Sequence, residues 1–305
     1  MTQKALAIAI AGLGNAVMAT PAVELLKKTG MKIDVLVSKN RCTNVVFMNW
    51  PEVIRTTYCV EKDYPRTYDY ILWTHPNWGP ERVKVNGHHL RLKFPKSVEN
   101  LEYRWKFKIH ETEMLANLVR KSFKIKAETP PARLFTNSES VNLDMPNPVI
   151  ISMGYAKDNK KWLVKHWGTQ NYVELCNMLH EDGFTPILAG SSGDYKADGK
   201  LLLQKCPFVV NLCGEFPIET TISVLGKCMG YIGNDSGLMH CASVQNIHTL
   251  GLFFSNGSSP HKNFPLGEKA NWLWRKHGKL KPKLVFDVWK SILAGKSFKE
   301  MKICG

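Results

Sequence analysis

The chain has 305 residues, of which 44% are hydrophobic, and it carries a formal net charge of +15. A chain of this length can bury the core of one large domain or two medium ones, and it lacks the run of roughly 18 apolar residues that a membrane-spanning helix needs. The charge predicts attraction to a polyanion, and it fits nucleic acid, anionic lipid headgroups and phosphorylated glycans equally well.

The eight cysteines are scattered through apolar segments and show neither a Cys-x-x-Cys pair nor another spacing typical of zinc. Thiols of this kind usually stay reduced in cytosolic proteins. We therefore predict a cytoplasmic protein with no bound metal and no resident cofactor.

The first predicted elements are an apolar strand over residues 5–11 and a helix over residues 16–28. The apolar run is short for a signal peptide and passes directly into a Gly-rich turn, so it is interpreted as a first buried strand. In that turn, Gly12 and Gly14 permit a tight bend and a close approach of backbone to a ligand, while Asn15 either bonds local backbone or orients an acceptor. The third glycine of the dinucleotide fingerprint is missing.

Further strands are predicted over residues 32–38 and 68–73, and a basic segment with interleaved aromatic residues follows, up to residue 126. This composition suits phosphate groups or an extruded nucleic-acid base, and it equally suits a solvated basic face. The candidate acceptor-binding residues around it are His75, Trp78, Arg104, Trp105 and Lys106.

An amphipathic helix is predicted over residues 110–120, with His110 at its start as a cap or as a catalytic group. Residues 137–148 are polar, contain proline and lack periodicity, which favours a linker. We expect a first domain over residues 1–142, a second over residues 143–282, and a closing helix and tail over residues 283–305.

The second half begins again with a strand, over residues 149–153, and a lysine-rich loop that contains Lys165. Strands over residues 184–189 and 208–212 follow, and then a helical stretch over residues 214–225. Ser152 and Gly154 lie at the end of the strand over residues 149–153.

The most informative stretch is a strand over residues 228–233, the turn Asn234-Asp235-Ser236-Gly237, a helix over residues 238–244 and a strand over residues 247–254. Such a crossover places its turn at the carboxyl edge of a parallel sheet, where open α/β folds bind ligands. The amides at the helix start suit a phosphate. Helix capping by Asp235 or Ser236 explains the same residues equally well.

Four blocks in this order resemble glycosyltransferase family 9, the lipopolysaccharide heptosyltransferase family. They are GLGNAVMATPAVELLK, YDYILW, Lys165-His166-Trp167, and GNDSGLMHCAS with LGLFFSNGSSP and FPLG. The resemblance covers most of the chain. It implies an α/β protein of the GT-B fold, with two Rossmann-like parallel-sheet domains facing a cleft, the acceptor in the first domain and a nucleoside-diphosphate sugar in the second.

The resemblance also implies site residues. Lys165 would neutralise the diphosphate, while Asp235 would accept hydrogen bonds from sugar hydroxyls or cap the helix. Acceptor binding would involve Gly12, Gly14 and Asn15. The implied donor-binding set is Ser152, Gly154, Lys165, Glu215, Glu219, Ser236, Gly237, Leu238 and His240.

The chain departs from the family pattern at Asn15, which stands where the heptosyltransferases carry the Asp proposed as catalytic base. A carboxylate can take a proton from a hydroxyl, whereas a neutral amide effectively cannot. Asn15, Lys165, Asp235 and His110 are the catalytic candidates, and His110, Glu111 and Glu113 are candidate substitutes for the missing base.

Three functions follow from these patterns. The first is metal-independent, inverting transfer of a sugar to a hydroxyl of an anionic lipopolysaccharide or oligosaccharide, with peripheral contact to a membrane. The second is phage-type glycosylation of hydroxymethylated bases in DNA. The third is a non-catalytic binding relative, which the missing Asp motivates.

Overall fold

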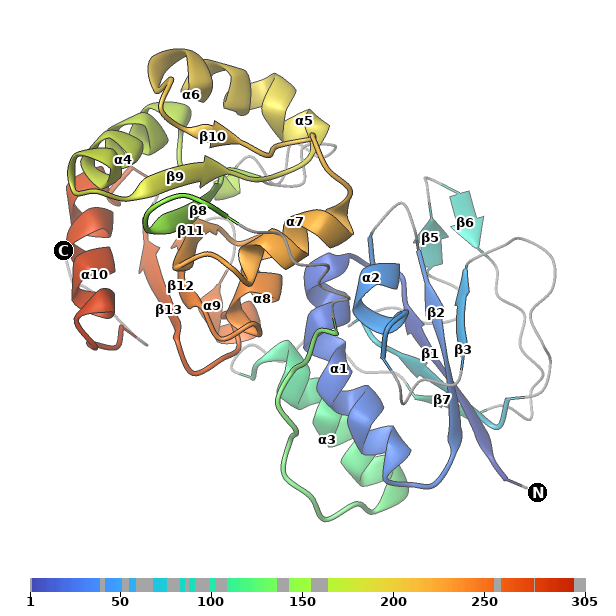
Figure 1. The fold of residues 1–305 in the computed structure, drawn as a ribbon. Helices are drawn as coiled ribbons and strands as arrows, with labels where there is room; N and C mark the ends of the chain where they lie inside the picture. Colours follow the sequence, from blue (N-terminus) through green and yellow to red (C-terminus); the bar gives the residue numbers. More distant parts are fainter. Residues whose placement is uncertain are drawn as a thin grey trace. The chain divides into compact units, whose positions relative to one another are not determined.

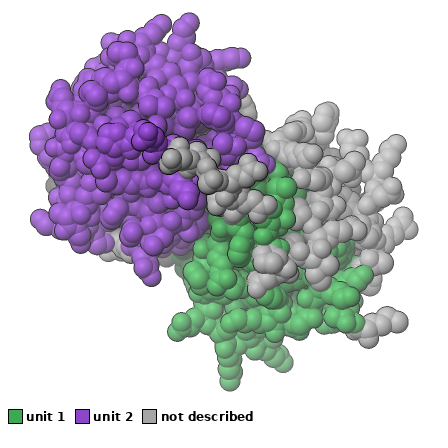
Figure 2. Space-filling model, in the orientation of Figure 1, with its two compact units in different colours: residues 1–136 green, residues 137–305 purple. Residues whose placement is uncertain are grey.

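The computed structural model describes residues 2–38, 42–50, 55–58, 68–75, 83–85, 88–90, 99–101, 109–135, 143–154, 164–254, 259–276 and 278–298. The chain divides into two compact units, Met1–Thr136 and Asn137–Gly305, which Figure 2 shows in green and purple. The expected domain boundary at residue 142 lies six residues beyond this division.

The first unit is built on a parallel sheet with the strand order β3-β2-β1-β4-β7 (Figure 1). Its central strand β1 is buried along almost its whole length, as expected for a strand that is covered on both faces. A separate antiparallel pair joins β5 to β6. The strands are β1 (Lys4–Ala9), β2 (Lys32–Val37), β3 (Arg55–Tyr58), β4 (Tyr70–Trp73), β5 (Val83–Val85), β6 (His88–Leu90) and β7 (Glu99–Leu101).

Among the described residues of this unit, the helices are α1 (Leu13–Lys27), α2 (Asn44–Phe47) and α3 (Glu111–Phe123). Helix α1 packs on β1 and on α3, and the hydroxyl of Thr112 donates to the backbone oxygen of Met18 at 2.9 Å. The start of α1 was predicted at residue 16, but the helix begins at Leu13. Asn15 therefore lies in the first helical turn rather than in the preceding loop.

The second unit is built on a six-stranded parallel sheet with the order β10-β9-β8-β11-β12-β13. Numbered along the unit, this order is 3-2-1-4-5-6, the arrangement of the Rossmann fold. The strands are β8 (Pro148–Ser152), β9 (Thr185–Leu188), β10 (Val210–Asn211), β11 (Gly230–Asn234), β12 (His248–Phe254) and β13 (Ala270–Arg275).

Helices cover both faces of this sheet (Figure 1). Helix α4 packs with α10, while α7 packs with α8. The bounds are α4 (Thr169–Glu181), α5 (Ser192–Asp194), the π-helix η2 (Tyr195–Gly199), α6 (Lys200–Lys205), α7 (Ile218–Leu225), α8 (Gly237–Ser243), α9 (Pro260–Asn263) and α10 (Pro282–Leu293).

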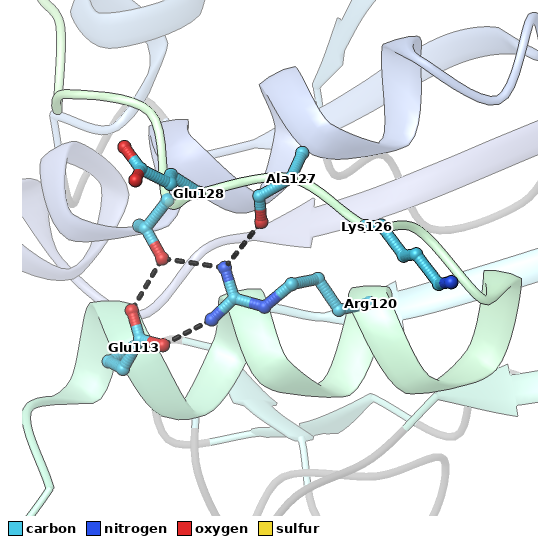
Figure 3. Close-up of a pocket in the computed structure, with 6 residues that line it drawn as sticks. Glu113, Arg120, Lys126, Ala127 and Glu128 are labelled. Atoms are coloured by element: carbon cyan, nitrogen blue, oxygen red, sulfur yellow. Dashed lines mark hydrogen bonds and ion pairs between the residues drawn. The ribbon is translucent and has the colours of Figure 1, made fainter.

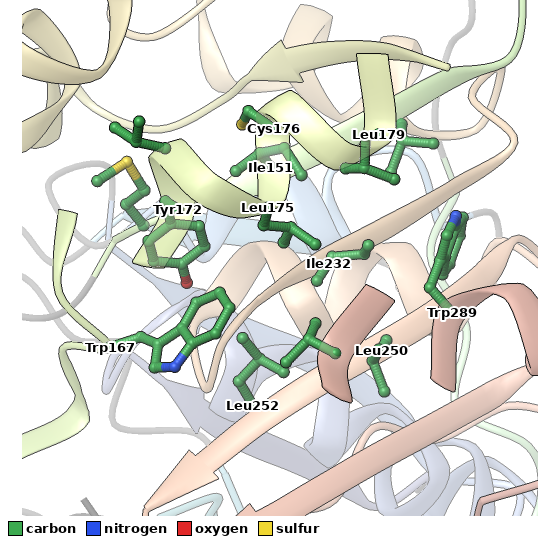
Figure 4. Close-up of a cluster of buried hydrophobic side chains, with 14 of the residues drawn as sticks. Ile151, Trp167, Tyr172, Leu175, Cys176, Leu179, Ile232, Leu250, Leu252 and Trp289 are labelled. Carbon is green, nitrogen blue, oxygen red and sulfur yellow. The ribbon is translucent and has the colours of Figure 1, made fainter. Parts of the chain in front are cut away.

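The core of the second unit lies between α4, α10 and the sheet (Figure 4). Trp167 meets Tyr172 edge to face, with ring centroids 4.9 Å apart, and its indole nitrogen donates to the backbone oxygen of Leu280 at 2.9 Å. Trp289 of α10 is fully buried and meets Phe184 edge to face. The closing helix α10 packs on α4 and β12 of its own unit.

None of the helices in the described part of the chain is both long enough and apolar enough to cross a membrane. No disulfide joins the six cysteines that lie in it, at positions 42, 176, 206, 213, 228 and 241.

Candidate functional site

In each unit the strand order reverses between two neighbouring strands, β1 and β4 in the first and β8 and β11 in the second. Open α/β sheets bind ligands at such switch points, beyond the carboxyl ends of the strands. Gly12 and His75 follow the two strands of the first unit, and Met153 and Asp235 follow those of the second. The turns that the sequence singled out therefore lie at the expected ligand-binding edges.

At the switch point of the second unit, a buried polar network joins the ends of β8 and β11 to α4. The amide nitrogen of Asn234 donates to the backbone oxygen of Met153 at 3.1 Å, and its oxygen accepts from the hydroxyl of Tyr172 at 2.8 Å. Burial raises the pKa of the Tyr172 phenol, so the hydroxyl stays protonated and donates. This network fixes the backbone from which the next turn begins.

The charged cluster of the site surrounds Asp235, in that turn. Lys165 places its ammonium nitrogen 2.5 Å from Oδ2 of Asp235, and the amide nitrogen of Asn263 donates to the same oxygen at 2.9 Å. His240, in α8, has Nε2 at 3.8 Å from the other oxygen, Oδ1. Lys165, Asp235 and His240 were predicted from the sequence, and the structure brings them together.

The carboxylate of Asp235 is held in its charged form. Burial by itself would raise its pKa, but the Lys165 ammonium and hydrogen bonding from His240 outweigh this effect and keep the pKa well below its usual range. A buried carboxylate of fixed negative charge can hold the lysine in place, and it leaves the ammonium group as the positive charge for an arriving anion.

At the start of α8 lies one of the two residues, Asp235 and Ser236, that were considered as its cap. Ser236 occupies the N-cap position, but among the described residues its side chain makes no capping hydrogen bond. Its oxygen lies 3.1 Å from the hydroxyl of Tyr231, which burial keeps protonated by raising its pKa. Ser236 and Gly237 are half-buried, while Leu238 is buried. Because α8 has only seven residues and aligns few peptide dipoles, Lys165 is the main positive charge at this turn.

The other predicted donor-binding residues are spread over the second unit. Ser152 is buried. Gly154 lies beside Asp194, whose carboxyl closes a capping box with Ser191 at the start of α5. Glu215 is exposed and accepts from the side chain of Asn211, and Glu219 is exposed in the first turn of α7.

In the first unit, Asn15 and Glu111 form a contact that the sequence does not reveal. The amide nitrogen of Asn15 lies 3.0 Å from Oε1 and 3.3 Å from Oε2 of Glu111. His110 is the N-cap of α3, and its Nδ1 accepts from the backbone nitrogen of Thr112 at 3.2 Å. Trp78, Arg104, Trp105 and Lys106 lie outside the described residues.

Sequence reasoning also missed Asn263 and Tyr172 as members of the site. Both are polar groups on helices, α9 and α4, and their partners lie 28 and 62 residues away in the chain. A local motif search has no signal for such contacts.

An open depression of about 560 Å³ beside α3 has a structural role (Figure 3). The guanidinium of Arg120 binds Glu113, the side chain of Asn117 at 3.0 Å, the hydroxyl of Thr129 at 2.8 Å and the backbone oxygen of Ala127 at 3.3 Å. These four bonds use both terminal nitrogens of the arginine, so the network ties the segment after α3 to the helix.

The described residues contain no group of three or more His, Cys, Asp or Glu side chains placed to hold a metal ion.

Residues 103–287, more than half of the chain, match the model of glycosyltransferase family 9 (heptosyltransferase). Among curated proteins, the lipopolysaccharide heptosyltransferase 2 of Escherichia coli K12 is 32% identical over 110 residues, which are 35% of this chain and 31% of the relative. The lipooligosaccharide heptosyltransferase 2 of Haemophilus influenzae is 32% identical over 111 residues, again 35% of this chain and 31% of the relative. The matched stretch thus spans about a third of the length of these relatives.

Among solved structures, an E. coli ADP-heptose LPS heptosyltransferase II aligns with a TM-score of 0.72 at 20% identity, over 96% of this chain and 99% of that one. The E. coli heptosyltransferase WaaC with ADP aligns with a TM-score of 0.69 at 14% identity, over 95% and 100% of the two chains. These likenesses confirm the fold class expected from the sequence, GT-B with two Rossmann-like parallel-sheet domains.

Proposed function

The chain belongs to glycosyltransferase family 9, and from this premise we propose that it transfers a sugar from a nucleoside-diphosphate sugar to a hydroxyl of an anionic glycan. The first donor to test is ADP-heptose, since one similar structure is that of an ADP-heptose LPS heptosyltransferase and another contains ADP. The first acceptor to test is a lipopolysaccharide core oligosaccharide, by analogy with the names of the curated relatives.

The observation that carries the proposal is the cluster of Lys165, Asp235, His240 and Asn263 at the switch point of the second unit. During transfer, the acceptor oxygen forms a bond to the anomeric carbon while the bond from that carbon to the diphosphate breaks. The bonding electrons leave with the diphosphate, whose negative charge grows, and a positive group placed there stabilises the transition state. Lys165 would supply that charge, and Asp235 would position it.

A direct displacement of this kind inverts the configuration at the anomeric carbon. Because lysine carries the positive charge in this scheme, we expect the reaction to need no metal and to continue in excess EDTA. The acceptor's phosphates would be attracted by the net charge of +15. The cytoplasmic location and the contact with a membrane surface remain predictions from the sequence.

The test is mass spectrometry of products after the full chain is incubated with nucleotide sugars, ADP-heptose first, and two acceptors. One acceptor is a core oligosaccharide, and the other is duplex DNA with hydroxymethylated bases. We expect one sugar added to the glycan. Transfer to DNA alone would favour the DNA-modifying function instead.

Thermal unfolding in the presence of ADP distinguishes a protein that binds the nucleotide without catalysis from one that does not bind nucleotides at all. At about 100 times its dissociation constant, a bound nucleotide should stabilise the fold by ~2.7 kcal/mol. Stabilisation without any product would indicate a non-catalytic relative. If no nucleotide tested gave a product or stabilised the fold, the proposal would be overturned.

A further inference from the structure

The segment between β13 and α10 is basic and exposed. From residue 269 to residue 286 the chain contains six Lys and Arg residues and neither Asp nor Glu. Lys276, Lys279 and Lys281 are exposed. The backbone nitrogen of Lys279 donates to the backbone oxygen of Lys276 at 3.0 Å, and Gly278 between them has a φ of 80°, so these two lysines lie at the two ends of one tight turn. Lys276, Lys279 and Lys281 are called the basic turn below.

The basic turn gains nothing from its charge within the protein. Among the residues that the structure describes, none of its three lysines forms an ion pair. Lys281 is the N-cap residue of α10, whose first turn has no acidic residue, and a cation at this end of a helix is unfavourable. Like charges placed close together also repel one another. An anion bound from outside would relieve this repulsion.

The basic turn lies at the ligand-binding edge of the second unit. It follows the carboxyl end of β13, which runs parallel to β12, and the parallel strands of such a sheet end at the same edge. Trp167, two residues after Lys165, donates from its indole nitrogen to the backbone oxygen of Leu280 at 2.9 Å. The loop that carries the lysine of the site is thus bonded directly to the basic turn.

The side chains around the basic turn favour contact by charge alone. The ring of Trp272 is stacked on Phe264 with centroids 4.9 Å apart, and Trp274 meets His261 edge to face at 5.3 Å, so these aromatic rings already have partners and are poorly placed to stack on a nucleic-acid base. The exposed large hydrophobic side chains of the described residues lie elsewhere in the chain. A methyl group added at Gly278 would meet open space. An exposed turn of this kind suits an extended surface of phosphates.

We propose that the basic turn binds the anionic headgroups of a membrane and so holds the carboxyl edge of the second unit close to a lipid-linked acceptor. The choice of a membrane over other polyanions rests on the proposed function, because a lipopolysaccharide acceptor is anchored in lipid. Clusters of lysines bind anionic lipid surfaces through charge, without insertion into the bilayer.

The test is co-sedimentation of the full chain with vesicles. One set contains phosphatidylglycerol and phosphatidylcholine in equal parts, and the other contains phosphatidylcholine alone. We expect wild type to bind the first set, less so as salt is raised, and to stay in solution with the second. Each lysine beside an anionic membrane contributes roughly a fivefold factor to binding, so Lys276→Gln/Lys279→Gln/Lys281→Gln should bind about 10²-fold more weakly.

A matched control separates the position of the charge from its amount. Lys205→Gln/Lys227→Gln/Lys296→Gln removes the same charge from three exposed lysines of the same unit. Lys205 and Lys227 precede β10 and β11, and Lys296 follows α10, so all three lie toward the opposite edge of the sheet. Because salt screens exposed charges over about 10 Å, we expect this control to bind within about threefold of wild type.

Equal weakening of the two glutamine variants would overturn the proposal, because total charge would then explain the binding. Equal binding of wild type to the two sets of vesicles would also overturn it. Lys276→Arg/Lys279→Arg/Lys281→Arg keeps the charge and should bind like wild type, and a loss there would show that the lysines do not act through charge. If the glutamine variant of the basic turn were weakened on duplex DNA but not on vesicles, the surface would be assigned to nucleic acid instead.

Transfer assays keep this inference distinguishable from the proposed function. A soluble core oligosaccharide needs no membrane, so the glutamine variant of the basic turn should transfer sugar to it with the kcat of wild type. A fall in kcat there would place the basic turn in the site itself and overturn the membrane assignment. Wild type that binds anionic vesicles but transfers no sugar would support the surface and count against the proposed function.

Discussion

Lys165 and Asp235 form an ion pair across 70 residues of the chain, with the ammonium nitrogen 2.5 Å from Oδ2 of the carboxylate. The side chain of Asp235 is 4% exposed and that of Lys165 is 16% exposed. The more accessible partner is therefore the cation. In the proposed reaction, a diphosphate bound at this turn would meet the lysine first, and Asp235 would hold the lysine in place.

Lys165→Met should impair both transfer and stability. Loss of the positive charge beside the leaving group should lower kcat by about 10²–10³. The buried Asp235 carboxylate would lose its main cation, which we expect to cost about 3 kcal/mol in the free energy of unfolding. Steady-state kinetics and urea unfolding measure the two effects.

The matched control is Lys283→Met, which removes a lysine paired with Asp287 on the exposed surface of α10. Exposed pairs contribute about 0–1 kcal/mol, so its unfolding and kinetics should stay close to wild type. Equal behaviour of the two methionine variants would show that Lys165 is an ordinary surface lysine.

Asp235 should make stability depend on pH in the acid range. The pKa of this carboxyl is lower in the folded protein than the value of about 3.9 in an unfolded chain. Its contribution is therefore complete above about pH 5 and is lost as the pH falls. The difference in melting temperature between wild type and Asp235→Asn should stay constant between pH 7 and pH 5 and narrow as the pH falls below about 4, and parallel curves down to the lowest pH at which the protein still folds would contradict this origin.

Tyr172→Phe should destabilise the second unit without removing any charged group of the site. The variant keeps the ring that packs on Trp167 but leaves the buried oxygen of Asn234 without its donor at 2.8 Å. We expect a loss of about 1–3 kcal/mol in the free energy of unfolding, the usual cost of an unsatisfied buried group. Wild-type unfolding in urea would mean that this network does not support the turn.

Gly267→Ala should be strongly destabilising. Gly267 has φ of 149°, and an added methyl group would lie 2.1 Å from the backbone oxygen of Ser243, the last residue of α8. Gly295 is the control, because it also has a positive φ of 84° but open space around it. Backbone strain alone should cost Gly295→Ala about 1–2 kcal/mol, and Gly267→Ala should exceed this by about 1–3 kcal/mol. Similar melting temperatures would refute the steric argument.

Cys228 should resist alkylation in the folded protein. Burial raises the pKa of its thiol to about 12, so hardly any reactive thiolate exists at pH 8. Cys42 is only half-buried and should react faster with iodoacetamide. Peptide mapping by mass spectrometry compares the two, and equal rates would contradict the burial of Cys228.

Much of the fold could be predicted because the strands are apolar runs separated by polar turns. The observed bounds of β2, β8 and β12 lie within one residue of the predicted ones. Strand β13, with the sequence ANWLWR, was not predicted. The strand order was not predictable from any local pattern, because it depends on which crossovers pass to which side of the first strand.

The site was predictable only where one motif or loop carries the residue. Lys165, Asp235 and His240 were found in this way, and they assemble. The contact of Glu111 with Asn15 depends on how two helices pack, which the spacing of residues along the chain does not encode. Capping by Asp235 or Ser236 was left open, and Ser236 takes the N-cap position while its hydroxyl lies 3.1 Å from the phenol of Tyr231.

The segment that follows α3 is attached again to the first unit before it reaches the second. Thr129 joins the Arg120 network, the backbone nitrogen of Arg133 donates to the hydroxyl of Thr20 at 3.0 Å, and the ring of Phe135 lies 5.8 Å from that of Trp50. A gene fragment meant to produce the first unit alone should therefore extend through Phe135. Ending it at the last residue of α3 would leave a buried arginine network and an aromatic surface open to water, and the shortened product should aggregate.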